Sequence, residues 1–241
     1  MTDYSQNGEQ PIILDLWAAH QKLERKDQPV PHPGRFLEIG AWDPIHFSNT
    51  RALIELGWSG VIIEPSPGPI INLLRCCTLC GYTPRELEAY GDRKQAPCSK
   101  CAGVRYGYND HLKIIAAAVS IGGGLIELEV TDDALSMLSD DTERLAQWRS
   151  VGGFYGKLTV PSIKPIDLFN QYGGDWDLIS IDTEGTSVPL LIDFLGCGIR
   201  PWIFVVEHDS RVIELNQHLE RENYRQAHIN QTNCVFELKG R

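Results

Sequence analysis

The segment from Arg35 to Pro65 carries two acidic residues at positions that suit the binding of a nucleoside. Its sequence, RFLEIGAWDPIHFSNTRALIELGWSGVIIEP, indicates a strand, a glycine turn, an amphipathic helix and a second strand. Gly40 allows a sharp bend after Glu38, because a residue without a Cβ lets the backbone reverse and approach a ligand. Glu64 ends the second strand, where its carboxylate can accept both hydroxyl hydrogens of a ribose. The pattern predicts half of a nucleoside-binding site.

The residues after Gly40 argue against a dinucleotide. A dinucleotide turn has glycines at the third and sixth positions of its fingerprint, so that backbone amides reach a pyrophosphate. This chain has Trp42 and Ile45 there, and Pro44 has no amide hydrogen to donate. A ligand with a ribose but no phosphates fits better. We therefore expect S-adenosylmethionine, the commonest ligand of that kind.

Titratable residues also follow two later apolar runs. Asp182 and Glu184 follow DLISI, and His208 follows WIFVVE. Methyl transfer needs a nucleophile in line with the sulfonium carbon and a base for the acceptor proton, and these three residues are the candidates. Two close carboxylates would also suit Mg²⁺, which would orient and acidify a hydroxyl. The structural alternatives are a turn-capping carboxylate and a strand-end histidine bonded to the backbone.

Four cysteines have the spacing of a zinc site. Cys77 and Cys80 form CTLC, and after seventeen residues Cys98 and Cys101 form CSKC. Each pair can direct two thiolates at one ion at roughly 2.3 Å, and two pairs complete a tetrahedron. Cys76 leaves the register of the first pair open, and free core thiols are the alternative. A site of four thiolates is closed, so the zinc would be structural and not catalytic.

Composition limits the class of protein. The 241 residues are 42% hydrophobic and 22% charged, which fits one globular domain with an insertion. The net charge of −10 repels phosphate backbones and argues against a protein whose partner is a nucleic acid. The sequence lacks an apolar stretch of about 18 residues and the features of a signal peptide, so we expect no membrane span and a cytoplasmic protein with reduced cysteines. Composition does not indicate an oligomeric state.

Periodicity indicates the elements that would position these residues. Apolar residues at helical spacing predict a helix over 12–23, followed by a proline-rich linker. After Glu64 the next strand is expected only at 112–120, about twice the usual crossover distance, and the gap holds five of the seven cysteines. Repeated strands with acids at their carboxyl ends predict an open, doubly wound α/β fold with a mostly parallel sheet.

The second half of the chain gives further expectations. GGGLIELEV predicts a strand, and the acidic residues 131–150 predict a flap or a short helix. LTVPSIKPIDLFNQY predicts a short edge strand before Pro161 and a helix that begins near Pro165. The residues from Tyr224 onward predict a closing antiparallel pair.

The order of these motifs resembles that of the FkbM-type methyltransferases, a branch of the class I enzymes that use S-adenosylmethionine. The resemblance covers about Arg35 to Asp209 and is carried by the SNT-helix-GW-strand-EP pattern, AAAVS, LTVPSIKPIDL, DLISIDTEG and FVVEHD. It implies a Rossmann-like sheet of seven strands and methyl transfer to a hydroxyl of a sugar or natural-product scaffold. The tail and helix at 1–34 would precede a Rossmann-like domain at 35–241, with a zinc-binding insertion at 75–105.

The resemblance also implies residue roles. Glu64 would bind the ribose, Ala117 would border the adenine, and Asp182 with Glu184 would face the acceptor. The expected donor-binding set is Glu38, Gly40, Ala41, Trp42, Glu64, Pro65 and Ala117. Pro44 stands where members commonly have glycine, and the cysteine insertion is not part of the usual pattern.

Two other functions are alternatives to O-methylation of a small-molecule or glycan acceptor. Residues 75–105 carry six basic residues against three acidic ones, which would suit a nucleic-acid methyltransferase guided by the zinc module. A solvated surface explains the same excess more simply. The third hypothesis is a non-catalytic donor-binding scaffold with the zinc module as an interaction domain.

Overall fold

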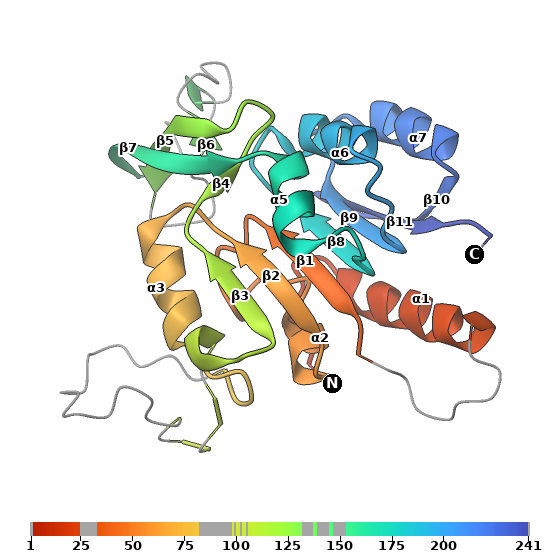
Figure 1. Cartoon of the computed structure of the whole chain (residues 1–241), viewed down its shortest axis with the longest axis horizontal. Coiled ribbons are helices and arrows are strands. Elements are labelled where there is room, and N and C mark those ends of the chain that lie inside the picture. The colour runs from red at the N-terminus through yellow and green to blue at the C-terminus, as the bar shows by residue number, and fades with distance from the viewer. Residues whose placement is uncertain are drawn as a thin grey trace.

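The computed structural model describes residues 2–24, 33–81, 98, 100, 101, 103, 104, 106–131, 137, 138, 145, 146 and 153–240. Seven strands form the main sheet in the order β10-β11-β9-β8-β1-β2-β3 (Figure 1). They are β1 (Arg35–Ile39), β2 (Ser59–Ile63), β3 (Leu112–Ile115), β8 (Leu178–Ile181), β9 (Ile203–Glu207), β10 (Tyr224–Ile229) and β11 (Asn233–Leu238). The first five are parallel to one another, and β11 runs antiparallel to β9 and β10. The expected mixed α/β fold with a seven-stranded, mostly parallel sheet and a closing antiparallel pair is confirmed.

Helices cover both faces of this sheet. The helices are α1 (Glu9–Glu24), α2 (Arg51–Glu55), α3 (Pro67–Arg75), α5 (Pro165–Tyr172), α6 (Ser187–Gly196) and α7 (Val212–Arg221), with a short 3₁₀ helix η1 (Tyr106–Tyr108). Successive strand residues point to opposite faces, so that Phe36 joins one core cluster and Leu37 the other. The Leu37 cluster contains residues of α5, α6 and α7, whereas the Phe36 cluster contains residues of α1, α2 and α3. The result is a three-layer arrangement.

The helices at 12–23 and from Pro165 are confirmed as α1 and α5. Ile13 and Trp17 of α1 are buried in the same core cluster as β1 and β9. The proposed boundary at residue 34 therefore separates segments that share one core. Within the described ranges, none of the helices combines the length and the apolar character that crossing a membrane would need.

A second, smaller sheet stands beyond the carboxyl ends of β2 and β3 (Figure 1). Its strand order is β4-β7-β5-β6, formed by β4 (Ala118–Val119), β7 (Phe154–Ile163), β5 (Gly124–Thr131) and β6 (Met137–Leu138). The sequence predicted the strand β5 but not the sheet. Most of the acidic segment 131–150 lies outside the described residues, so its expected flap or helix is not described.

One strand prediction was wrong in this region, and a second was right about an edge strand but wrong about its length. The expected strand at 112–120 is two strands: β3 pairs with β2 in the main sheet, and β4 pairs with β7 in the small one. The expected short edge strand is the ten-residue β7, which continues through Pro161 and pairs with β5 along its length. Pro161 is accommodated because β4 pairs with β7 only at Ser162 and Ile163.

Candidate active site and cysteine cluster

A cavity of about 320 Å³ lies at the carboxyl ends of β1, β2 and β8. The chain runs from β1 through β2 to β3 on one side and from β8 to β9 on the other, so the strand order reverses beside β1. Ligands of open α/β sheets bind at such a reversal. The strand ends contribute residues 39–42, 63–66, 117–121 and 182–184, and the small sheet contributes Ile126, Leu128 and Leu138.

Gly40 makes the predicted bend after β1 and also connects three strand ends. Its φ is +80°, and a Cβ on it would lie 1.6 Å from the carbonyl oxygen of Asp182. The Gly40 amide donates to the Ile63 carbonyl at 2.9 Å, and the Asp182 amide donates to the Ile39 carbonyl at 3.0 Å. Only glycine fits this junction, because a side chain would push β8 away from β1.

Glu64 is 5% exposed and lines the cavity. Its Oε1 accepts the Ser66 amide at 2.6 Å, and its Oε2 accepts the Trp42 amide at 3.1 Å. Burial raises the pKa of Glu64, and hydrogen bonds from these two backbone amides and from the Ser66 side chain act in the opposite direction. A carboxylate has about four acceptor positions, so these bonds leave capacity for a ligand hydroxyl. The two amides fix the orientation of the carboxylate toward the cavity.

Glu38 was expected to contact the donor, but it does not line the cavity. Its carboxyl group is 6% exposed, and its Oε2 accepts the hydroxyl hydrogen of Thr50, the N-cap residue of α2, at 2.7 Å. Burial, with a smaller contribution from the charge of Glu64, raises the pKa of Glu38 to about 7. A contact between Glu38 and the donor stays a prediction.

The remaining expected donor residues Ala41, Trp42, Pro65 and Ala117 all line the cavity. Sequence reasoning missed Phe47, whose ring stacks on that of Trp42 with centroids 5.6 Å apart and planes at 25°. Both residues have positive φ, 38° for Trp42 and 60° for Phe47, and Phe47 is 52% exposed. A positive φ at a bulky residue is strained, and such strain concentrates at binding sites. The only signal in the sequence was an aromatic residue close to the glycine turn.

Three carboxylates gather beside the cavity. Each of these residues, Asp182, Glu184 and Glu207, has one carboxylate oxygen within 4.8 Å of a carboxylate oxygen of each of the other two. Asp182 and Glu184 line the cavity, and Glu207 accepts the Glu184 amide and the Ser187 hydroxyl, both at 3.1 Å. Our sequence reasoning did not select Glu207, although it ends an apolar run as the other two acids do. The set can accept a proton or hold a divalent cation.

His208, the third candidate base, does not line the cavity. Its Nδ1 accepts the Ser210 amide at 3.1 Å, and its Nε2 lies 3.3 Å from the Asn230 carbonyl oxygen. These contacts are those of a strand-end histidine bonded to the backbone. Its role as the base stays a prediction.

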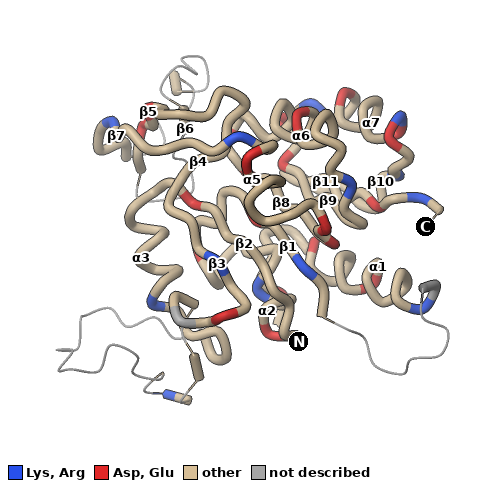
Figure 2. Tube along the Cα trace, in the orientation of Figure 1, with Lys and Arg blue, Asp and Glu red and all other residues tan. Residues whose placement is uncertain are grey.

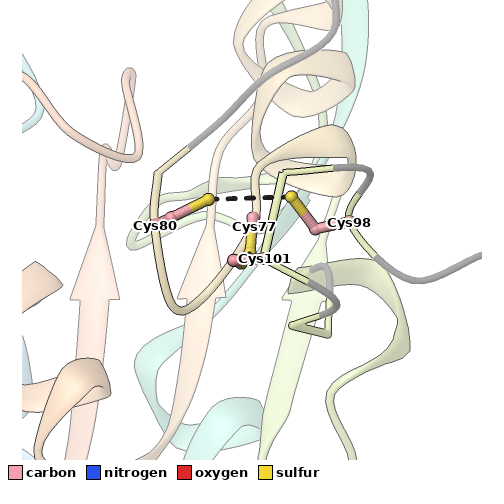
Figure 3. Close-up of side chains that lie close together, drawn as sticks. All are labelled: Cys77, Cys80, Cys98 and Cys101. Atoms are coloured by element: carbon pink, nitrogen blue, oxygen red, sulfur yellow. Dashed lines mark hydrogen bonds between the residues drawn. The ribbon is translucent and has the colours of Figure 1, made fainter.

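The four cysteines of the two predicted pairs lie together (Figure 3). The Sγ atoms of Cys77 and Cys101 are 3.5 Å apart, and those of Cys80 and Cys98 are 3.6 Å apart. Tetrahedral zinc with bonds of 2.3 Å separates its sulfurs by about 3.8 Å, whereas a disulfide is only about 2.05 Å long. Cys76 belongs instead to a hydrophobic core cluster. The geometry therefore selects Cys77 over Cys76 as the possible ligand.

The surroundings of the cluster favour thiolate formation at one sulfur. Burial raises the pKa of Cys98, but the backbone amides of Lys100 and Cys101 and two neighbouring thiols outweigh it and lower the pKa to about 7. The amide of Gly103 lowers the pKa of Cys101, but hydrogen bonds to the other thiols raise it to about 12. At neutral pH the Cys98 thiol is therefore partly ionised. A bound divalent cation would stabilise the thiolate forms of the other three cysteines.

The fold and the site define an α/β protein with a cavity where the strand order of its sheet reverses. The sequence matches the family described as "Methyltransferase FkbM domain" over residues 38–232. This chain belongs to the FkbM family and is a methyltransferase, as the resemblance implied. A search of curated proteins finds no match.

Proposed function

We propose that this methyltransferase transfers the methyl group of S-adenosylmethionine to a hydroxyl oxygen of a sugar, a glycan or a natural-product-like acceptor. The observation that carries the proposal is the buried carboxylate of Glu64, which two backbone amides hold at the cavity wall next to Gly40. This arrangement suits the hydroxyls of a ribose, and the cavity-lining residues that the structure describes include no Lys or Arg for a pyrophosphate.

The cavity supports one orientation of the donor. With the ribose at Glu64, the methionine part lies along Gly40 and Ala41, toward Asp182. The adenine lies on the opposite side, against Pro65 and the apolar residues that begin at Ala117. The small sheet extends that apolar wall through Ile126 and Leu128.

The acceptor oxygen attacks the methyl carbon in line with the carbon–sulfur bond, which breaks as the new carbon–oxygen bond forms. The donor becomes the thioether S-adenosylhomocysteine, the acceptor becomes a methyl ether, and the acceptor proton passes to a base. Asp182 and Glu184 are our candidates because they face the cavity, and Glu207 holds the Glu184 amide in place. His208 would need an acceptor that extends beyond the cavity. Mg²⁺ bound by the acidic set would lower the pKa of the hydroxyl instead.

We further propose that Cys77, Cys80, Cys98 and Cys101 bind one structural zinc ion. The sulfur separations support it, and so does Gly103, at which a Cβ would lie 3.0 Å from the Cys77 sulfur and 3.2 Å from the Cys101 sulfur. The insertion at 75–105 would then be a metal-stabilised unit within a domain spanning 35–241, after the helical segment 1–34.

Calorimetry with S-adenosylmethionine and with its product S-adenosylhomocysteine tests the donor site. Glu64→Ala should weaken binding by about 1 to 3 kcal/mol, roughly 5- to 150-fold, because the ribose loses a charged acceptor. Glu127→Ala, which removes an exposed carboxylate on the small sheet, is the control and should bind normally. Equal affinity of wild type and Glu64→Ala would contradict the assignment.

An acceptor panel tests the reaction. Sugars, glycosylated small molecules and nucleic acids are incubated with the donor, and S-adenosylhomocysteine formation is measured. We expect turnover with hydroxylated small molecules, since Figure 2 shows basic residues of the described chain scattered among acidic ones. Turnover confined to nucleic acids, falling steeply with salt, would favour the nucleic-acid alternative. Donor binding without turnover on any acceptor would favour the scaffold.

A further inference from the structure

We propose that the cysteine cluster positions the donor loop, residues 41–47, through Arg51 and Tyr106, so that metal occupancy and donor binding strengthen each other. The inference rests on the donor site and the metal site proposed above and goes beyond both. It assigns a positioning role to two buried residues that contact neither the metal nor the cavity.

Arg51 is the first link. It begins α2 and is 1% exposed, although it is charged. Its Nη1 donates to the backbone carbonyl of Cys77 and to the Tyr106 hydroxyl, both at 3.1 Å, while Nε and Nη2 donate to Glu55 at 3.0 and 2.9 Å. A buried guanidinium without its partners is costly, so its position depends on where the Cys77 carbonyl lies.

Tyr106 is the second link. It is 2% exposed, and its hydroxyl donates to the Pro44 carbonyl in the middle of the donor loop at 3.4 Å. Its amide donates to the carbonyl of Cys76, which precedes the first ligand, at 2.9 Å. Tyr106 thus contacts both the donor loop and the segment that enters the cysteine cluster.

Gly81 gives a direct contact between the same two regions. It has a φ of +69°, and a Cβ on it would lie 2.7 Å from Cδ1 of Ile45, in the donor loop. The Gly81 amide donates to the Cys77 carbonyl at 3.0 Å, which closes the turn containing both cysteines of the first pair. The Cys77 carbonyl therefore accepts hydrogen bonds from this turn and from Arg51. The turn also packs on Ile45.

The other side of the donor loop forms the cavity. The Trp42 amide holds the Glu64 carboxylate at 3.1 Å, and the stacked rings of Trp42 and Phe47 line the cavity. Both residues have positive φ, so the loop needs support from its surroundings to keep this shape. Arg51, Tyr106 and Gly81 supply that support from the side opposite the donor.

Loss of the metal would remove this support. Without a metal, the side chains of the first cysteine pair contact those of the second only through sulfur–sulfur contacts of 3.5 and 3.6 Å, so the turn from Cys77 to Gly81 would be held less firmly. Coupling between two sites in one protein typically amounts to 5- to 150-fold in affinity, and it is reciprocal. We expect metal removal to weaken donor binding at least fivefold, and donor binding to tighten the metal by the same factor.

The experiment compares zinc-loaded and chelator-treated full-length protein. S-adenosylhomocysteine affinity is measured by calorimetry, and zinc affinity by competition with a chromogenic chelator, with and without saturating S-adenosylhomocysteine. We expect zinc to strengthen S-adenosylhomocysteine binding at least fivefold. Saturating S-adenosylhomocysteine should strengthen zinc binding by the same factor.

Tyr106→Phe separates positioning from metal binding. It removes only the hydroxyl that connects Arg51 to Pro44, so one zinc per chain should remain while the zinc-loaded protein binds S-adenosylhomocysteine several-fold more weakly. The matched control is Tyr224→Phe. Tyr224 is also fully buried, and its hydroxyl donates to a proline carbonyl, that of Pro201, at 2.6 Å, but it does not line the cavity. The control should lower thermal stability and leave S-adenosylhomocysteine affinity unchanged.

Each contrary outcome has a distinct meaning. Equal S-adenosylhomocysteine affinity with and without zinc, together with normal binding by Tyr106→Phe, overturns the coupling and leaves the donor site intact. No S-adenosylhomocysteine binding in either form overturns the proposed function and this inference with it. If chelation unfolds the protein, the zinc-loaded Tyr106→Phe variant decides: an affinity equal to that of Tyr224→Phe refutes the positioning role.

Discussion

Glu38→Gln should flatten the pH dependence of stability. The pKa of Glu38 is about 7 in the folded protein, against an ordinary value of 4.5. Between these two values the folded state keeps a proton that the unfolded state has lost, so stability falls as pH rises through this range. The difference corresponds to about 3 kcal/mol. Glutamine is uncharged at every pH, and its side-chain oxygen can still accept the Thr50 hydroxyl.

Urea unfolding at pH 5, 6, 7 and 8 measures the effect. Wild type should lose about 2 to 3 kcal/mol more than Glu38→Gln over this range, because the other titrating groups cancel in the comparison. Glu127→Gln, on the exposed face of the small sheet, should keep the wild-type slope. Parallel curves for wild type and Glu38→Gln would show that Glu38 is ionised in the folded protein and would refute the reasoning.

Three further variants test other parts of the account. Gly40→Ala should cost more than about 2 kcal/mol and abolish donor binding, because its Cβ would overlap the Asp182 carbonyl; a stable variant with normal S-adenosylhomocysteine affinity would contradict the junction. Cys98→Ser should lose the metal and make the insertion sensitive to protease while the sheet still melts cooperatively; full zinc content would mean that the ligands are wrong. Asp182→Asn should lower turnover far more than donor affinity, and the reverse would place Asp182 in donor binding.

The main sheet and the cysteine cluster could be predicted because their signals are local. β8 and β9 are short apolar runs that end in acids, and the CTLC and CSKC pairs specify their own geometry. Glu64 could be selected because a carboxylate that ends a strand must lie at the edge where ligands bind.

The small sheet could not be predicted, because its pairing is distant and short. β4 has two residues and pairs with Ser162 and Ile163, more than forty residues later. The burial of Arg51 could not be predicted either, since an arginine in NTRALIEL suggests the solvent face of a helix. Its burial depends on Tyr106 and on the Cys77 carbonyl, which only the tertiary structure brings to it.

A structure of the zinc-loaded protein with S-adenosylhomocysteine tests the central claim most directly. We predict both ribose hydroxyls within hydrogen-bonding distance of the Glu64 carboxylate, with the sulfur between Gly40 and the carboxylates of Asp182 and Glu184. A ligand bound away from Glu64, or a cavity filled by the side chains of the small sheet, would contradict it.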